Sequence, residues 1–427
     1  MPELSSGYRR YALGLLTLVF TLIYLDRGLI ILLLQPIKED LHLSDTQLGL
    51  LTGVAFGLFY ATLGLPIARW ADRGNRARIT SVAIGLWGAT LMLCLFITSF
   101  FQLVAARVAA AVGESGCMPP TYSLLGDYFP RPAERARAMA VYWLGNPLGL
   151  LASFVLGGWL NDHYGWRKTF LLMGLPAAVV GVLVKLTLAE PRAGASRESV
   201  TQRPLPALSE VLITLWRQRS ARHLSLAVIL LWTMGGGMAP WYAAFMIRSH
   251  GMHTAELGVW LGLIFGFGGM MGILSGGYIA SRWFGSNERD QMRSSAITVG
   301  LLVPCFTLFL LLPGRYEALL ALTPLAVVFN FFLGPSFALM QRLVVDDMRA
   351  TTLAVVMLFA NLIGLGAAPQ LVGIFSDLLA PAFGVNSLRY AMLAVSLVAL
   401  WSAYHFWRAG ESVKEDLESL AHPLPQS

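Results

Sequence analysis

Residues 13–34 read LGLLTLVFTLIYLDRGLIILLL. The stretch is long and apolar enough to cross a bilayer as a helix, apart from the adjacent pair Asp26 and Arg27. Charged side chains at bilayer depth are rare and costly, and they mark functional sites by default. The stretch therefore predicts a membrane helix that carries part of a functional site.

The rest of the chain repeats this apolar pattern. Of its 427 residues, 56% are hydrophobic and only 13% are charged, which is too little charge for the surface of a soluble protein of this size. An all-α membrane protein with twelve transmembrane helices is the predicted fold class. The predicted spans are roughly 11–34, 47–68, 78–99, 101–126, 137–160, 168–189, 222–247, 255–280, 294–312, 317–341, 352–376 and 389–407.

One long polar stretch, residues 190–220, interrupts the series of spans. It predicts a cytoplasmic linker between an N-terminal six-helix bundle at 1–189 and a C-terminal six-helix bundle at 221–408. A cytoplasmic tail at 409–427 follows the second bundle. The later part of the linker, around 208–216, suits a short surface helix.

The two halves of the chain resemble each other. Arg135 and Asp162 flank the fifth span, and Arg349 and Asp377 flank the eleventh at nearly the same spacing. Parallel repeats of this kind, related by a pseudo-two-fold axis along the membrane normal, are the architecture of many secondary transporters. The chain is therefore expected to form two related six-helix bundles.

The net charge of +7 reflects orientation rather than a nucleic-acid partner. If the spans alternate sides from a cytoplasmic N-terminus, Lys and Arg concentrate in the segments on the inner side. This distribution predicts a multi-pass protein of the cell (inner) membrane with both termini in the cytoplasm.

A second pair of deep charges lies in the fourth span. Arg107 and Glu114 are seven residues apart, so they project from one helix face about 10 Å apart. Together with Asp26 and Arg27 they form a set that is neutral in sum, which predicts mutual pairing around one polar cavity. These four are the candidate substrate-binding and coupling residues. The alternative is an ion-pair staple that only holds helices together, but apolar contacts do that without buried charge.

The seventh span contains WTMGGGMAPWY at 232–242, whose three glycines and proline predict a flexible or broken helix. Its methionines and aromatic rings suit an adaptable apolar pocket. The alternative is ordinary packing with an outer aromatic belt. The possible cavity-lining residues are Tyr24, Trp232, Met234, Met238, Trp241 and Tyr242.

Residue types also exclude several functions. Spans seven to twelve carry no Asp, Glu, Lys or Arg in their interiors, so a cavity with one polar and one apolar wall would suit an amphiphile. There is no P-loop and no GxSxG nucleophile motif, so we expect no enzyme. Cys94, Cys117 and Cys305 are dispersed among the spans, which predicts no disulfide framework, no metal and no bound cofactor.

The loop at 68–78, ARWADRGNRAR, resembles the cytoplasmic signature G-x-x-x-D-R-x-G-R-R of the major facilitator superfamily. Asp72, Arg73 and Arg76 match the signature, whereas Ala68 replaces its first glycine. The resemblance implies a cytoplasmic gate at these residues. The alternative is plain positive charge on the inner side of the membrane.

Further motifs resemble one branch of that superfamily. Residues 24–27 resemble the Y-x-D-R of Spinster-type transporters, and 106–115 resemble their R-G-L-x-G-x-G-E-A. Residues 120–129 and 135–139 resemble their P-T-L-I-x-D-L-F and R-S-R motifs. The close match covers about 20–160, and the chain resembles a bacterial Spinster homologue.

This resemblance implies the major facilitator fold and a secondary active exporter of an amphiphilic lipid, such as a sphingolipid or a lysophospholipid, that works by alternating access. It implies roles in transport for Asp26, Arg27 and Glu114, and it adds Asp127, Arg135 and Arg137 to the cytoplasmic gate. The expected partners are the lipid-like substrate and the bilayer, and the expected state is a monomer. The alternatives are a proton-coupled multidrug or organic-anion porter and a non-transporting receptor or scaffold.

The proton is the expected coupling ion. Burial disfavours the charged form of a carboxyl group, and a neighbouring arginine favours it. Capture of that arginine by an anionic substrate would therefore let the acid take up a proton. Glu114 is the better candidate, because glycines and prolines flank it and allow its helix to move, whereas Asp26 is tied to Arg27.

Overall fold

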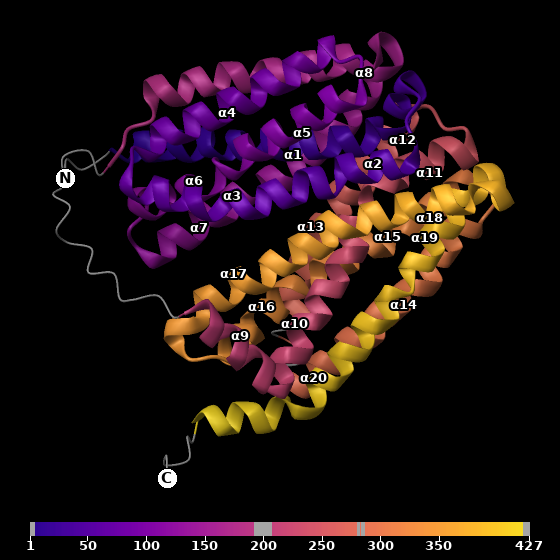
Figure 1. Ribbon diagram of the computed structural model, residues 1–427. Helices are drawn as coiled ribbons and strands as arrows, with labels where there is room; N and C mark the ends of the chain where they lie inside the picture. The colour runs from indigo at the N-terminus through magenta and orange to yellow at the C-terminus, as the bar shows by residue number, and fades with distance from the viewer. Residues whose placement is uncertain (1–4, 192–206, 280–281, 283–286, 422–427) are drawn as a thin grey trace. The chain divides into compact units, whose positions relative to one another are not determined.

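The computed structural model describes residues 5–191, 207–279, 282 and 287–421. Every regular element in these ranges is a helix (Figure 1), which confirms the predicted all-α class. Packing divides the chain into two compact units. The predicted bundle boundaries at 189 and 221 stay a prediction.

The first unit comprises 1–197 together with 240–266, so the second part of span seven and the first part of span eight pack with the N-terminal half. Its helices are α1 (Ser6–Leu41), α2 (Asp45–Thr52), α3 (Val54–Arg73), α4 (Arg76–Leu93), η1 (Cys94–Phe96), α5 (Phe100–Ser115), α6 (Met118–Tyr128), α7 (Pro132–Trp143), α8 (Gly145–Thr187), α11 (Ala239–His250, from Pro240 onward) and α12 (Thr254–Leu261).

Small residues allow α1 and α8 to approach closely. A Cβ atom on Gly28 would lie 2.6 Å from Ser153 Oγ, and one on Gly145 would lie 2.9 Å from the Thr17 carbonyl oxygen. The glycines that open the fifth span therefore serve close helix packing. This contact holds the buried face of α1 in place, and α1 carries Asp26.

Two helices of this unit are interrupted where the sequence has glycine and proline. The fourth span breaks between α5 and α6 at Gly116 and Cys117, and prolines open α6. A Cβ atom on Gly113 would lie 2.7 Å from Trp87 Cβ, so this glycine serves packing against α4. Helix α8 contains two helices joined at Gly165, whose φ of 77° is a left-handed value that suits glycine.

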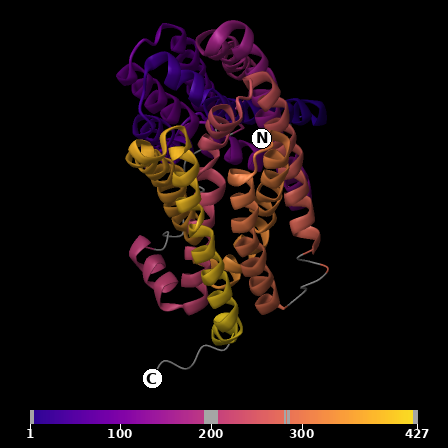
Figure 2. The ribbon, with the colours of Figure 1, turned by 90° about the vertical axis from the view of Figure 1, so that its right-hand side faces the viewer.

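The second unit comprises 198–239 and 267–427. Its helices are α9 (Leu208–Arg217), α10 (Arg219–Trp232), η3 (Thr233–Gly237), α13 (Gly268–Ile279), α14 (Glu288–Leu311), α15 (Arg315–Phe331), α16 (Leu333–Arg342), η6 (Asp346–Met348), α17 (Arg349–Ala360), η7 (Asn361–Ala367), α18 (Ala368–Phe383), η8 (Gly384–Asn386), α19 (Ser387–Ser396) and α20 (Val398–Ala421), and η4 (Gly262–Phe267) ends at its boundary. Helix α9 confirms the short helix predicted late in the linker, whereas 192–206 lie outside the described residues. Helices α14 and α20 run side by side (Figures 1 and 2).

Spans seven and eleven each contain a π-helical turn in this unit. Span seven changes from α10 to π-helix at η3. Span eleven changes from α17 to π-helix at η7. The turns pack against each other, and a Cβ atom on Gly237 would lie 2.5 Å from Ala368 Cβ. The predicted break in span seven is therefore confirmed, and it is a local change in the hydrogen-bonding pattern of the helix.

The internal repeat is visible in matching arginine contacts. Arg135 donates hydrogen bonds to the carbonyl oxygens of Gly126 and Phe129, at and just after the end of α6. In the second unit, Arg349 Nε donates to the carbonyl oxygen of Gln341 in α16 at 2.9 Å. In both units an arginine at the start of one helix therefore satisfies carbonyl groups at the end of the preceding one.

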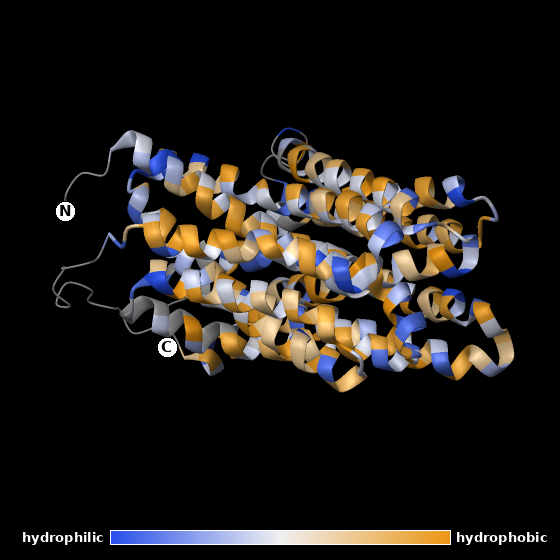
Figure 3. Cartoon of the chain, turned by 90° about the horizontal axis from the view of Figure 1, so that it is seen from above, coloured by the Kyte–Doolittle hydropathy of each residue, from blue (hydrophilic) through white to orange (hydrophobic). Residues whose placement is uncertain are grey.

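Length and composition confirm a multi-pass membrane protein. Eight stretches of the described chain are long and apolar enough to cross a membrane, and two of them, Pro132–Thr187 and Thr351–Ser419, each contain two predicted spans. Helices α2–α3 and α5–α6 account for the remaining two of the twelve. In Figure 3 the helices are mostly apolar along their length. Large apolar side chains are exposed, such as Phe101 at 80% and Leu186 at 74%, as expected for surfaces that face lipid.

Candidate functional site

Four charges of the first unit form two ion pairs between α1 and α5. Arg107 Nη1 lies 3.1 Å from Asp26 Oδ2. Arg27 Nε donates a hydrogen bond to Glu114 Oε2 at 2.9 Å. Each helix supplies one acid and one base, and each pair joins the two helices. The predicted mutual pairing is confirmed, whereas the role of these residues in transport stays a prediction.

The members of this four-charge site differ in exposure. Asp26 and Glu114 have no exposed surface, and the side chain of Arg107 is 7% exposed. The side chain of Arg27 is 20% exposed and is thus the most accessible of the four. A soluble ligand or headgroup would therefore meet Arg27 first, while the acids remain behind the arginines.

Aromatic rings from α1 and α3 surround the arginines. The Arg27 guanidinium carbon lies 5.0–5.5 Å from the ring centroids of Tyr24, Phe56 and Tyr60, and that of Arg107 lies 4.9 Å from Phe56. Cations are attracted to aromatic faces at such distances, most strongly where water is excluded. The rings therefore stabilise both arginines and leave their N–H edges for anions. Phe56 and Tyr60 were missed by sequence reasoning, because aromatic residues four apart are common in membrane helices.

Several polar atoms of the site have no hydrogen-bond partner among the described residues. They are Asp26 Oδ1, Glu114 Oε1 and Arg107 Nε. Buried polar atoms are nearly always paired, so each exception requires an explanation. Two free acceptor atoms on buried acids can accept a proton or a donor group of a ligand, which is the chemistry that the site offers.

Four of the predicted lining residues in span seven are completely buried, whereas the side chains that line an open cavity are partly exposed. Met234, Met238, Trp241 and Tyr242 have no exposed surface. Tyr242 stacks on Phe265, with ring centroids 5.8 Å apart. Their side chains are packed inside the protein, and a lining role stays a prediction.

The other two predicted lining residues are partly exposed. Tyr24 lies beside Arg27, as described above. Trp232 lies 5.2 Å from Phe329 in the second unit, measured between ring centroids.

The predicted cytoplasmic gate is centred on Arg76. This arginine is fully buried at the start of α4. Its Nη2 lies 2.8 Å from Asp127 Oδ2, its Nη1 donates to Ser123 Oγ at 2.8 Å, and Glu190 forms an ion pair with its guanidinium group. The cluster joins α4, α6 and the segment after α8. Sequence reasoning missed Glu190, because this residue opens the polar stretch that was assigned to the linker.

The remaining predicted gate residues have other positions. Asp72 and Arg73 lie in α3, but their side chains are outside the described part of the structure. Arg135 contacts backbone carbonyl groups, as described above. Arg137 is exposed and lines a pocket beside α1. Asp127 is thus the predicted gate residue that the described structure brings into contact with Arg76.

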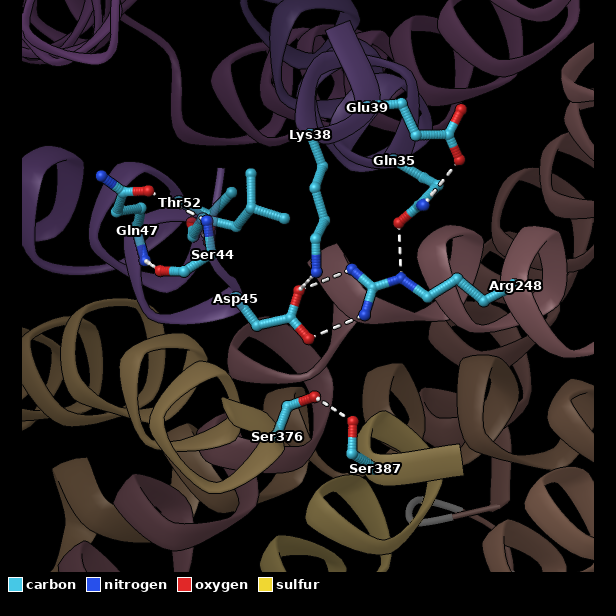
Figure 4. Close-up of polar contacts among 11 residues, drawn as sticks. Gln35, Lys38, Glu39, Ser44, Asp45, Gln47, Thr52, Arg248, Ser376 and Ser387 are labelled. Atoms are coloured by element: carbon cyan, nitrogen blue, oxygen red, sulfur yellow. Dashed lines mark hydrogen bonds and ion pairs between the residues drawn. The ribbon is translucent and has the colours of Figure 1, made fainter. Parts of the chain in front are cut away.

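A second charged network, absent from the predictions, lies where α1 and α2 meet α11 (Figure 4). Arg248, in the last turn of α11, makes two hydrogen bonds of 2.6 and 2.7 Å to the buried carboxylate of Asp45. Lys38 Nζ lies 2.6 Å from the same carboxylate, and Gln35 accepts a hydrogen bond from Arg248 Nε. Sequence reasoning missed this network, because charges near the ends of apolar runs are ordinary.

The fold and the buried charges together define a class, that of multi-pass membrane transporters. A family model described as the Major Facilitator Superfamily matches residues 16–369. The chain therefore belongs to the major facilitator superfamily, as a Spinster-type member.

Named relatives extend this assignment. An MFS-type efflux pump of Mycolicibacterium smegmatis is 33% identical over 410 residues, which cover 95% of this chain and 94% of that protein. The sphingosine-1-phosphate transporter SPNS2 of Danio rerio is 25% identical over 446 residues, which cover 97% and 86%. The crystal structure of a bacterial homologue of the human lysosomal transporter Spinster, inward-facing and unoccupied, is 28% identical with a TM-score of 0.81, and the match covers 96% of this chain and 99% of that one.

Proposed function

We propose that this protein is a secondary active exporter of an amphiphilic lipid with an anionic headgroup, such as a phosphorylated sphingolipid or a lysophospholipid, and that protons drive it. The observation that carries the proposal is the four-charge site, in which the partly exposed Arg27 is paired with the fully buried Glu114. The name of the Danio rerio relative supports a lipid of this class.

Arg27 is the proposed headgroup ligand. A guanidinium group binds phosphate through a rigid set of donors, and the aromatic rings around Arg27 fix its plane. Among the described residues, the buried Asp, Glu, Lys and Arg side chains all belong to the first unit. This one-sided distribution suits an amphiphile better than a sugar, which would need polar groups throughout its site.

Glu114 is the proposed proton carrier. A phosphate that binds Arg27 competes with Glu114 for the same N–H groups. A carboxylate with no exposed surface that loses its counter-charge becomes neutral by taking up a proton. Substrate binding and proton uptake are thereby linked through one arginine, and Asp26 stays paired with Arg107.

Two charged clusters are the proposed gates of alternating access. Arg76 with Glu190 lies at the start of α4, and Arg248 with Asp45 lies at the end of α11. If the N-terminus is cytoplasmic, as predicted, the first cluster lies on the inner side and the second on the outer side of the membrane. Movement of span seven away from α2 would require the Arg248–Asp45 contact to break.

A flux assay in proteoliposomes tests the proposal. The protein is reconstituted, and export of a fluorescent lysophospholipid is measured with and without a pH gradient. Arg27→Ala should reduce flux about tenfold or more, because a hydrogen-bonded charge contributes about 1.5–3 kcal/mol. Glu114→Gln mimics the protonated acid and should remove the response to the gradient. Lys185→Ala, at an exposed lysine of α8, is the matched control and should transport normally.

The outcomes separate substrate binding from coupling. Normal flux in Arg27→Ala contradicts the headgroup assignment. An unchanged gradient response in both Glu114→Gln and Asp26→Asn contradicts proton coupling through this site.

A proton-coupled drug porter is the second candidate, and the name of the Mycolicibacterium smegmatis efflux pump favours it. The same liposomes distinguish the two functions. Gradient-driven flux of a cationic dye, without flux of the lysophospholipid, would support the porter. Competition of the dye by the lysophospholipid would support one amphiphile site.

A further inference from the structure

A pocket in the first unit lies where the start of α1 meets α7, and it shares no residue with the four-charge site. Its volume is about 290 Å³, near the lower end of the range for small-molecule sites. Arg9, Arg10 and Leu13 line it from α1, and Arg137 and Val141 line it from α7. The pocket therefore combines three guanidinium groups with apolar side chains.

The positive charge of the pocket is only partly neutralised. Glu134 is its acidic lining residue, and this carboxylate is shared between Arg9 at 3.4 Å and Arg131 at 2.9 Å. Arg10 and Arg137 make no side-chain hydrogen bond or ion pair within the described chain. The Nε atom of Arg9 is buried and also has no hydrogen-bond partner there. Donor groups for an anion therefore converge on the pocket from both helices.

The surroundings of the pocket place it at the level where a membrane span begins. The apolar run of α1 starts at Tyr11, directly after the two arginines. Tyr11, Val141 and Trp143 are 43–45% exposed, so apolar surface continues from the pocket along both helices. Basic groups beside apolar helix surface match the two parts of a lipid, a charged headgroup and an acyl chain.

We propose that this pocket binds the phosphate headgroup of an anionic phospholipid of the bilayer, with its acyl chains along α1 and α7. Arg10 binds the phosphate from α1, and Arg137 binds it from α7. A soluble anion would use the arginines but would leave the apolar strip exposed. The site is independent of the proposed transport function, because none of the four deep charges takes part.

Lipid binding to the purified full-length protein tests the proposal. The delipidated protein in detergent is titrated with phosphatidylglycerol and with phosphatidylcholine, and bound lipid is counted by native mass spectrometry. Wild type should prefer phosphatidylglycerol. The double variant Arg10→Gln/Arg137→Gln should bind phosphatidylglycerol at least about tenfold more weakly, since each basic group at the membrane surface contributes to affinity.

Matched variants separate this pocket from other sites. Arg78→Gln/Arg217→Gln removes two exposed arginines outside the pocket and should leave binding unchanged. Equal binding in wild type and Arg10→Gln/Arg137→Gln overturns the proposal, and so does an equal loss in Arg10→Gln/Arg137→Gln and Arg78→Gln/Arg217→Gln. Glycerol 3-phosphate serves as the headgroup without chains, and displacement of the lipid by an equal concentration of it would overturn the lipid assignment in favour of a simple anion site.

Discussion

Span one and span seven are the first spans of the two halves of the chain. They differ in buried charge and in the regularity of their helical backbone. Span one is a continuous helix, α1, with charged residues buried against α5. Span seven carries no deep charge, and its helix is interrupted by the glycine-rich π-turn η3. The first helix carries buried charge on an uninterrupted α-helix, and the second has a backbone that departs from regular α-helix. Buried charge and the π-turn thus lie in different spans.

The largest expected effect is loss of the counter-charge that α5 supplies to Asp26 of α1. Arg107→Met leaves Asp26 buried without its ion-pair partner, which should destabilise the protein by about 3–5 kcal/mol. Thermal unfolding in detergent, followed by tryptophan fluorescence, measures the change. The double variant Asp26→Asn/Arg107→Met should recover most of the loss. A single variant as stable as wild type would show that α1 does not depend on this pairing.

A smaller effect on stability is expected from the network of Arg248, which connects span seven to the end of span one through Gln35. Asp45→Asn removes the charge that accepts two hydrogen bonds from Arg248, which should destabilise the first unit by about 1.5–3 kcal/mol. Asp40→Asn is the matched control, because Asp40 is 40% exposed and pairs with Arg167 at the surface. An exposed pair contributes at most about 1 kcal/mol. Equal shifts in unfolding temperature would contradict a special role for Asp45.

The smallest effect on stability is expected from adding a single methyl group to η3 of span seven. Gly237→Ala places a Cβ atom 2.5 Å from Ala368 Cβ, and such overpacking should destabilise the second unit by about 1–3 kcal/mol. Gly14→Ala in α1 is the control, because nothing lies within 4 Å of the added atom. It should be neutral or stabilising by up to about 1 kcal/mol. Similar stability of the two variants would show that the π-turn tolerates side chains.

Hydropathy predicted where the membrane helices lie, but not how their backbones run. A run such as 101–126 is apolar throughout, so it reads as one span, although the chain breaks between Ser115 and Met118. Three glycines and a proline predicted the break in span seven. The π-turn at 361–367 in span eleven was not predicted, and in the folded chain it packs against η3.

The four deep charges were predictable because each is expensive in hydrocarbon and therefore conspicuous. Their aromatic neighbours Phe56 and Tyr60 were not, and neither were Glu190 and Arg248. Glu190 and Arg248 lie at the ends of spans, where charges meet water and need no partner, so only the folded chain shows that each is paired. Charged residues inside apolar spans can be found from the sequence, because burying them costs free energy. Charged residues at the ends of spans cannot, because their pairing appears only in the folded chain.

The matching contacts of Arg135 and Arg349 bear on the history of the molecule. Both arginines bond carbonyl groups at the end of the preceding α-helix of their unit, whereas the buried charges of the described residues occur in the first unit alone. If the halves descend from one duplicated ancestor, the arginine contact was inherited by both copies. The charged site then belongs to later divergence, in which one copy kept or acquired the ionisable residues while the other became apolar.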